Sequence, residues 1–141
     1  MPSVPFHYVD LRVFCYATEE EKRVESALRT YLPEEYHIER AESEGHYGDR
    51  IVVLSARVEN ADEIRHVLSQ VATLDDIDAV RAELDDRVDD NCSFYLTLDK
   101  QTAFGGEVRR GDGITLRAKV EAYPAKRENA VENARDLLAE L

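Results

Sequence analysis

The sequence has few of the residues that anchor many small proteins. It contains two cysteines, one methionine and no tryptophan in 141 residues, and lysine occurs only at Lys22, Lys100, Lys119 and Lys126. It has no run of about 18 apolar residues, and no charged N-terminal segment followed by an apolar stretch. We therefore expect neither a membrane span nor a secretory signal, and a cytoplasmic protein.

The motifs of catalysis and of metal binding are also missing. His7, His37 and His66 have no metal-ligand spacing to cysteine or acid, which argues against a zinc site. The sequence has no nucleophile elbow, phosphate loop or dinucleotide fingerprint. Cys15 and Cys92 occupy apolar positions of predicted strands, where a free thiol packs as a small hydrophobe. We expect no cofactor, no metal and no enzymatic activity.

Acidic residues dominate the charge, with a formal net charge of -12. The acids are spread over predicted helices, as at residues 19–21 and 75–90, and are not gathered in a tail. Such a surface suits a cytoplasm of very high salt, where charges are screened over about 3 Å at 1 M. We interpret the chain as coming from a halophile, with an ordinary acidic mesophile protein as the alternative.

Hydrophobic periodicity predicts alternating strands and helices in one domain over residues 1–141. Period-two alternation indicates strands at residues 9–17, 92–98 and 114–122, and an apolar run indicates one at residues 51–58. We expect a further short strand at residues 36–42. Helical spacing indicates helices at residues 18–32, 60–71, 75–86 and 130–141, the first opened by a capping box of Thr18 and Glu21 and the second by Asn60. This pattern predicts an α+β fold, a single antiparallel or mixed sheet of about four or five strands with helices packed on one face.

The segment from Cys92 to Arg127 differs from the rest of the chain in its charge. It holds seven basic residues against four acids, and it contains two alternating runs joined by a Gly-rich turn. This pattern predicts a long basic β-hairpin. We expect its cations to form a binding surface for an anionic partner.

Strand alternation also predicts which side chains face away from the helices. If the apolar sets centred on Leu11, Leu54, Leu96 and Leu116 face the helices, the opposite face carries cations and aromatic rings. Its members are Arg12, Phe14, Tyr16, Arg57, Tyr95, Thr97, Asp99, Arg117 and Lys119. An open sheet face of this composition is typical of RNA-binding modules that stack bases and hold phosphates. The alternative is a solvated face with compensating charge pairs.

Further candidates lie around this hairpin. Lys100 and Gln101 follow the first hairpin strand, Arg109 and Arg110 extend the basic edge, and Lys126 and Arg127 follow the last strand. The candidate RNA-binding residues are therefore Arg12, Phe14, Arg57, Tyr95, Lys100, Gln101, Arg109, Arg110, Arg117, Lys119, Lys126 and Arg127.

Four segments resemble one known family. They are VDLRVFCYATEEEKRV (residues 9–24), EGHYGDRI (44–51), FYLTLDKQTAFGGEV (94–108) and LRAKVEAYPAKRENAV (116–131). Together they look like the archaeal RNA-binding-domain family described as predicted exosome subunits. The resemblance covers nearly the whole chain, and it implies a fold like that of ribosomal protein L5 and a role in RNA binding.

Two functions follow as hypotheses. The first is a non-catalytic RNA-binding protein, associated with RNA processing or with exosome-type degradation, that uses the basic hairpin and the open sheet face. The second is an interaction or assembly module that docks an acidic partner, or dimerises, through the same face. The expected partners are RNA and subunits of an RNA-processing complex, and the chain itself is a monomer or a homodimer.

Overall fold

The computed structural model describes residues 4–141 and is built around one five-stranded sheet. All neighbouring strands are antiparallel, in the order β2-β3-β1-β5-β4. The strands are β1 (Phe6–Cys15), β2 (Glu39–Glu44), β3 (Arg50–Val58), β4 (Ser93–Asp99) and β5 (Gly113–Val120). The prediction of an α+β fold with a single sheet is confirmed, and the sheet is antiparallel throughout.

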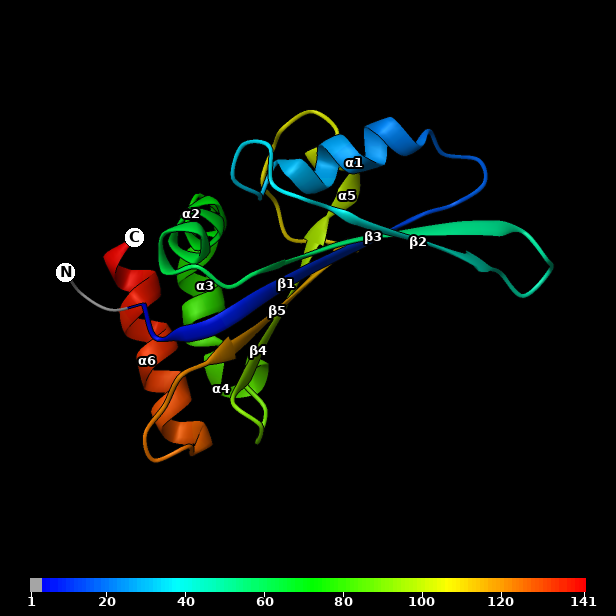
Figure 1. Ribbon diagram of the computed structural model, residues 1–141. Helices are drawn as coiled ribbons and strands as arrows, with labels where there is room; N and C mark the ends of the chain where they lie inside the picture. Colours follow the sequence, from blue (N-terminus) through cyan, green and yellow to red (C-terminus); the bar gives the residue numbers. More distant parts are fainter. Residues whose placement is uncertain (1–3) are drawn as a thin grey trace.

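The helices lie in two groups along this sheet (Figure 1). The first group, over the end where β1 finishes, comprises α1 (Glu21–Arg29) and α5 (Lys100–Ala103). The second group lies toward the other end and comprises α2 (Ala61–Val71), α3 (Ile77–Ala82), α4 (Leu84–Arg87) and α6 (Arg127–Glu140). The β2–β3 hairpin projects beyond both groups (Figure 1).

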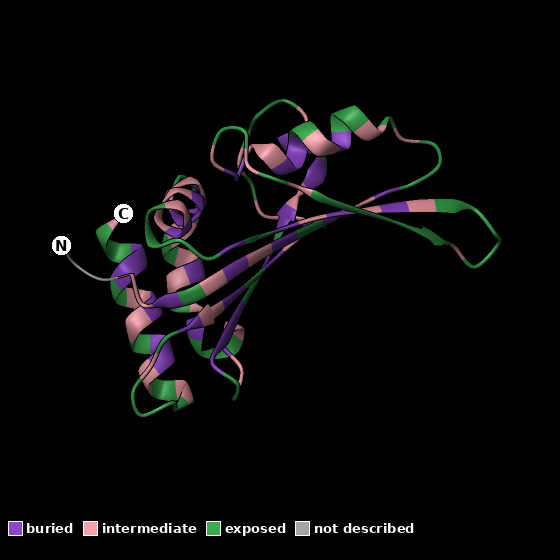
Figure 2. Ribbon diagram, viewed as in Figure 1, coloured by how far each residue is buried: buried purple, intermediate pink, exposed green. Residues whose placement is uncertain are grey.

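Alternation along the strands places the core on one side of the sheet. Leu11 lies opposite Ala56 of β3 and Leu116 of β5, and Leu116 lies opposite Leu96 of β4; all four are buried. Figure 2 shows buried and accessible residues alternating along β1. Burying a side chain such as leucine stabilises the fold by about 1.5 to 3 kcal/mol. The predicted apolar sets are therefore confirmed as the core face.

Of the two predicted helix N-caps, one is confirmed and one is wrong. The side chain of Asn60 accepts hydrogen bonds from the backbone N–H groups of Asp62 and Glu63, at 2.9 and 3.3 Å, as predicted. The predicted capping box of Thr18 is wrong, because α1 begins at Glu21 with Glu20 as its N-cap. Residues 16–19 form a turn instead, in which the Glu19 N–H donates to the Tyr16 carbonyl.

Other predicted elements also differ from the observed ones. The second strand begins at Glu39, three residues later than predicted. The single helix expected over residues 75–86 is two short helices, separated at Glu83, whose φ of -93° and ψ of 4° depart from helical values. The Gly-rich turn of the basic hairpin contains the short helix α5. These differences leave the order and the faces of the strands unchanged.

Two further expectations concern cysteine and membranes. Cys15 and Cys92 are free and buried, as expected of core thiols. Among the helices of residues 4–141, none is both long and apolar enough to cross a membrane.

Candidate functional site

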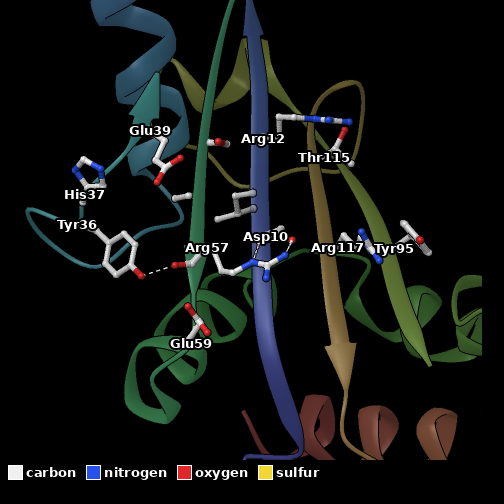
Figure 3. Close-up of a pocket in the computed structure, with 13 residues that line it drawn as sticks. Asp10, Arg12, Tyr36, His37, Glu39, Arg57, Glu59, Tyr95, Thr115 and Arg117 are labelled. Atoms are coloured by element: carbon white, nitrogen blue, oxygen red, sulfur yellow. Dashed lines mark hydrogen bonds and ion pairs between the residues drawn. The ribbon is translucent and has the colours of Figure 1, made fainter. Parts of the chain in front are cut away.

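The face of the sheet opposite the core carries a hollow of about 940 Å³. Side chains of β1, β3, β4 and β5 form its floor, and residues of the segment before β2 line one side (Figure 3). The lining residues are Asp10, Leu11, Arg12, Tyr36, His37, Glu39, Ser55, Ala56, Arg57, Glu59, Tyr95, Thr115 and Arg117. The predicted open face is thus an accessible and recessed surface.

Arg12 and Arg117 are the central cations of this hollow. Arg117 lies opposite Asp10 and Arg12 opposite Thr115, so the two arginines are diagonal neighbours on adjacent strands, about 7 to 8 Å apart. Both are exposed, and within residues 4–141 neither forms a salt bridge. Arg12 lies over the Phe14 ring, 5.4 Å from its centroid. Both guanidinium groups therefore keep their charge available to a ligand.

Arg57, beside them, is already neutralised. Its Nε and Nη2 donate to the two carboxylate oxygens of Asp10 at 2.8 and 2.9 Å, and its guanidinium lies 4.0 Å from the centroid of the Tyr8 ring. The hydrogen bond with Asp10 raises the pKa of Arg57 above its ordinary value. Tyr36 donates its phenol hydroxyl to the Arg57 carbonyl, which fastens the segment before β2 against β3 (Figure 3). This cluster shapes one wall of the hollow.

Tyr95 and Lys119 lie toward the β4 side. Tyr95 is opposite Arg117 in the β4–β5 pair, and 40% of its surface is exposed. Lys119 is opposite Ser93 and donates to the backbone carbonyl of Asn91. An accessible aromatic ring next to an unpaired arginine is suited to stacking against a planar ligand group.

Lys100 lies inside the protein, away from this face. Its Nζ donates to the Phe14 carbonyl at 2.8 Å and to Oε1 of Glu19 at 2.6 Å, and the residue is only 6% exposed. A side chain at Gly113, whose φ is +116°, would place its Cβ 2.4 Å from the Cβ of Lys100. The hydrogen bond of Lys100 to Phe14 therefore connects the start of α5 to the end of β1. Its neighbour Gln101 is exposed.

The charge of Glu19 is held in place by the same contacts. Burial raises the pKa of this carboxyl, but hydrogen bonds from Lys100 and from the Tyr16 N–H lower it more, so that the net pKa lies below the ordinary 4.5. The Lys100–Glu19 pair is thus an ionised pair with little solvent around it, since the two side chains are 8% and 20% exposed.

The other cations of the β4–β5 connection are also paired with acids. Arg110 contacts Asp76 at 2.7 Å and Glu83 at 2.8 Å, which ties the connection to the break between α3 and α4. Arg109 lies 3.5 Å from Glu107 and 4.0 Å from Asp75. The hydrogen bond with Asp76 raises the pKa of Arg110. The predicted basic edge is therefore largely neutralised.

The last two candidates lie at the start of α6. Lys126 is the N-cap residue of that helix and is exposed, whereas Arg127 donates through Nε to the Val88 carbonyl at 2.9 Å.

The structure thus divides the twelve candidate residues into two groups. Six share the open face, Arg12, Phe14, Arg57, Tyr95, Arg117 and Lys119, and six lie elsewhere, Lys100, Gln101, Arg109, Arg110, Lys126 and Arg127.

Several residues of the hollow were missed from the sequence. Asp10 shares the parity of Arg12 along β1, so strand alternation alone could have identified it. The same holds for Tyr8, whose ring contacts Arg57 beside the hollow. His37 lies in the segment before β2, and Glu39 is the first residue of β2. No periodic signal in the sequence predicts that this part of the chain lies beside β3. Within residues 4–141, no group of three or more His, Cys, Asp or Glu side chains is placed to hold a metal ion.

The sequence and the fold were compared with known proteins. A family model described as RNA binding matches residues 8–120. A protein of Pyrococcus abyssi that is named an RNA-binding protein is 34% identical over 143 residues, which cover 94% of this chain and 93% of that protein.

Solved structures of archaeal proteins show the same fold. A protein of Methanothermobacter thermautotrophicus is 40% identical, with a TM-score of 0.79 over 94% of this chain and 98% of that chain. A protein of Archaeoglobus fulgidus is 29% identical, with a TM-score of 0.84 over 94% of this chain and 99% of that chain. The α+β architecture described above is therefore that of its structural relatives.

Proposed function

We propose that this chain, which belongs to the family described as RNA binding, binds RNA through the open face of its sheet. The observation that carries the proposal is the pair Arg12 and Arg117. Both are exposed in a hollow, and among the described residues neither has the kind of acidic partner that neutralises Arg57, Arg109 and Arg110. In a chain of net charge -12, unpaired cations gathered in one recess attract an anionic ligand to that recess.

The chemistry of the two arginines supports this role. A guanidinium presents a planar set of donors that matches the oxygens of a phosphate, and it is more weakly hydrated than an ammonium group. Tyr95 lies beside Arg117 and offers a ring on which a base can stack, an interaction worth about 1 to 3 kcal/mol per base. Lys119 and the Arg12–Phe14 pair extend the same surface along the strands. RNA would thus be bound by a few arginine contacts together with stacking.

The paired cations would contribute in another way. Lys100 and Arg110 hold the β4–β5 connection to β1 and to the α3–α4 region, so they support the strands that carry the face. Association with RNA-processing or exosome-type machinery is proposed as a consequence of RNA binding, and the acidic helix layer on the opposite side of the sheet is free to contact proteins. Copurification of processing subunits, retained in a variant that no longer binds RNA, would support a protein contact.

The test compares two double variants of equal charge change. Arg12→Gln with Arg117→Gln removes the unpaired cations, whereas Arg109→Gln with Arg110→Gln removes two paired ones. Each variant is titrated with a fluorescent single-stranded RNA. We expect the first to bind at least about a hundredfold more weakly, at roughly tenfold for each charged contact, and the second within about threefold of the wild type.

A circular-dichroism melt establishes that each variant is folded. If the Arg12 and Arg117 variant is folded and still binds RNA as the wild type does, the proposal is wrong. If no RNA binds to the wild-type chain, the surface serves another purpose, and docking of an acidic protein or dimerisation through the same face becomes the better account.

A further inference from the structure

We infer that the hollow binds an unpaired guanine of single-stranded RNA and that Glu39 accepts hydrogen bonds from the edge of this base. The inference rests on the proposed function and deepens it, because it names the kind of nucleotide that the face would select. It starts from the acids of the hollow, which an RNA-binding surface would be expected to avoid.

The mixture of charges on this face disfavours a duplex. A double helix presents mainly phosphates and sugars to a protein, and side chains contact its bases poorly. Glu39 and Glu59 line the hollow alongside Arg12 and Arg117, so that phosphates laid across the whole face would meet carboxylates. A single strand can turn its phosphates toward the arginines and a base toward the acids. The alternating charges therefore favour an unpaired nucleotide.

The acids of the hollow are not equivalent. Asp10 is fully used by Arg57, which donates to both of its oxygens. Glu59 lies close enough to Arg57 and to Tyr36 to influence their pKa values. Glu39 forms no salt bridge within residues 4–141, and it is exposed at the rim of the hollow (Figure 3). Glu59 likewise forms no salt bridge within residues 4–141, and what distinguishes Glu39 is its place in the register of the sheet.

The register of the sheet relates Glu39 to Arg12. Both lie opposite Ser55 of β3, Glu39 from β2 and Arg12 from β1. They therefore occupy one row across the sheet, two strand spacings or about 10 Å apart. A nucleotide lying across β3 would place its phosphate at Arg12 and its base at Glu39, with the hydroxyl of Ser55 between them.

The chemistry of a carboxylate selects among the four bases. An ionised carboxylate only accepts hydrogen bonds, and it accepts two at once through its two oxygens. The Watson–Crick edge of guanine presents two adjacent donors, the N1–H and the N2 amino group. Adenine and cytosine present an amino group next to a ring nitrogen whose lone pair repels the carboxylate, and uracil presents one N–H between two carbonyl oxygens. Guanine is the base that satisfies both oxygens.

The experiment uses four RNA octamers that differ at one position. Each is oligouridine with guanosine, adenosine, cytidine or uridine at its fourth position, and the full chain is titrated with each at one salt concentration. We expect the guanosine octamer to bind about tenfold more tightly than the others, the discrimination that one good bidentate contact provides. Inosine, which lacks the N2 amino group, should lose several-fold of this advantage.

Two variants assign the selectivity to Glu39. Glu39→Gln should bring the four octamers within about twofold of each other while leaving the binding of oligouridine in place. Glu44→Gln is the matched control, because Glu44 is also exposed on β2 and changes the charge equally, but it lies on the opposite side of the strand.

The outcomes separate this inference from the proposed function. Equal binding of the four octamers by the wild type, or a guanosine preference that survives Glu39→Gln, would overturn the inference and leave RNA binding intact. Tighter binding of a duplex than of any octamer would also overturn it. Failure of every RNA to bind would overturn the proposed function and the inference together.

Discussion

The open sheet face and the β4–β5 connection carry similar numbers of cations but use them differently. On the face, Arg12 and Arg117 have no carboxylate partner among the described residues, and they line a hollow. In the connection, Lys100 is buried against Glu19, and Arg110 bridges Asp76 and Glu83. The first group is free to meet a ligand, and the second group holds the strands in place.

This difference shows that the charge of a segment does not predict its role. The stretch from Cys92 to Arg127 is basic as a sequence, yet most of its excess charge is cancelled by acids that flank α3 and by Glu19 of the turn after β1. The binding surface forms where the sheet brings Arg12 of β1 next to Arg117 of β5, and the acid opposite Arg117, Asp10, is bound by Arg57. Four predictions test this division.

The largest expected effect is on stability, at Lys100. In Lys100→Met the Glu19 carboxylate and the Phe14 carbonyl lose their donor. Breaking a fully buried ion pair in this way costs about 3 to 5 kcal/mol, and the 20% exposure of the Glu19 side chain places the expected loss at the lower end. Urea unfolding should show this loss. Adding Glu19→Gln should recover part of it, since the uncompensated charge is then gone. An unfolding free energy equal to that of the wild type would contradict the buried pair.

A matched pair of arginines should separate binding from stability. Arg117→Gln should weaken RNA binding about tenfold and leave the unfolding free energy nearly unchanged, because Arg117 forms no ion pair within residues 4–141. Arg110→Gln should cost about 1 kcal/mol of stability, through its two ion pairs, and leave RNA affinity unchanged. Binding titrations and urea melts of both variants check this. The reverse pattern would show that the two regions had been assigned the wrong way round.

The effect of pH should sharpen the contrast. The pKa of Glu19 in the folded protein lies below its ordinary 4.5, so ionised Glu19 stabilises the fold fully above pH 4.5 and progressively less as the pH falls through the folded pKa. The stability difference between wild type and Lys100→Met should therefore be constant near neutral pH and narrow below pH 4.5. Urea melts across this range check the trend, and a constant difference down to acid unfolding would contradict it.

The smallest expected effect is that of salt on RNA affinity. With two or three phosphate contacts from the face, the slope of log affinity against log salt should be about -1 to -2. A surface that also used the cations of the β4–β5 connection would give a steeper slope. Titrations between about 0.1 and 1 M KCl measure it, and a slope of about -5 or steeper would mean that far more cations contact the RNA. A shallow slope would also suit the high-salt cytoplasm that the acidic composition predicts.

Strand alternation was the sequence signal from which most of the fold could be predicted. Leu11, Leu96 and Leu116 were assigned to the core from a period of two, and the same parity placed Arg12 and Arg117 on the other side. This signal is local, because neighbouring side chains along a strand point to opposite faces whatever the strand packs against. The fold class and the open face could therefore be predicted.

What could not be predicted depends on contacts between distant parts of the chain. Arg110 meets Asp76 across 34 positions, and Lys100 meets Glu19 across 81. No local sequence pattern distinguishes these paired cations from Arg117. What differs is the position of Arg117 in the sheet, which only the folded chain shows. Glu39 likewise joins the hollow through a distant contact, because the pairing of β2 with β3 places it opposite Ser55. The likeness to ribosomal protein L5, implied by the family resemblance, stays a prediction.

The most direct test of the division is an NMR titration of the arginine side chains with a single-stranded RNA. The Nε–H signals of Arg12 and Arg117 should shift progressively and saturate together. The Nε–H of Arg110, which donates to Asp76, should stay in place and serves as the internal control. Shifts at Arg109 and Arg110 with Arg12 and Arg117 unmoved would contradict the account and would place RNA on the β4–β5 connection.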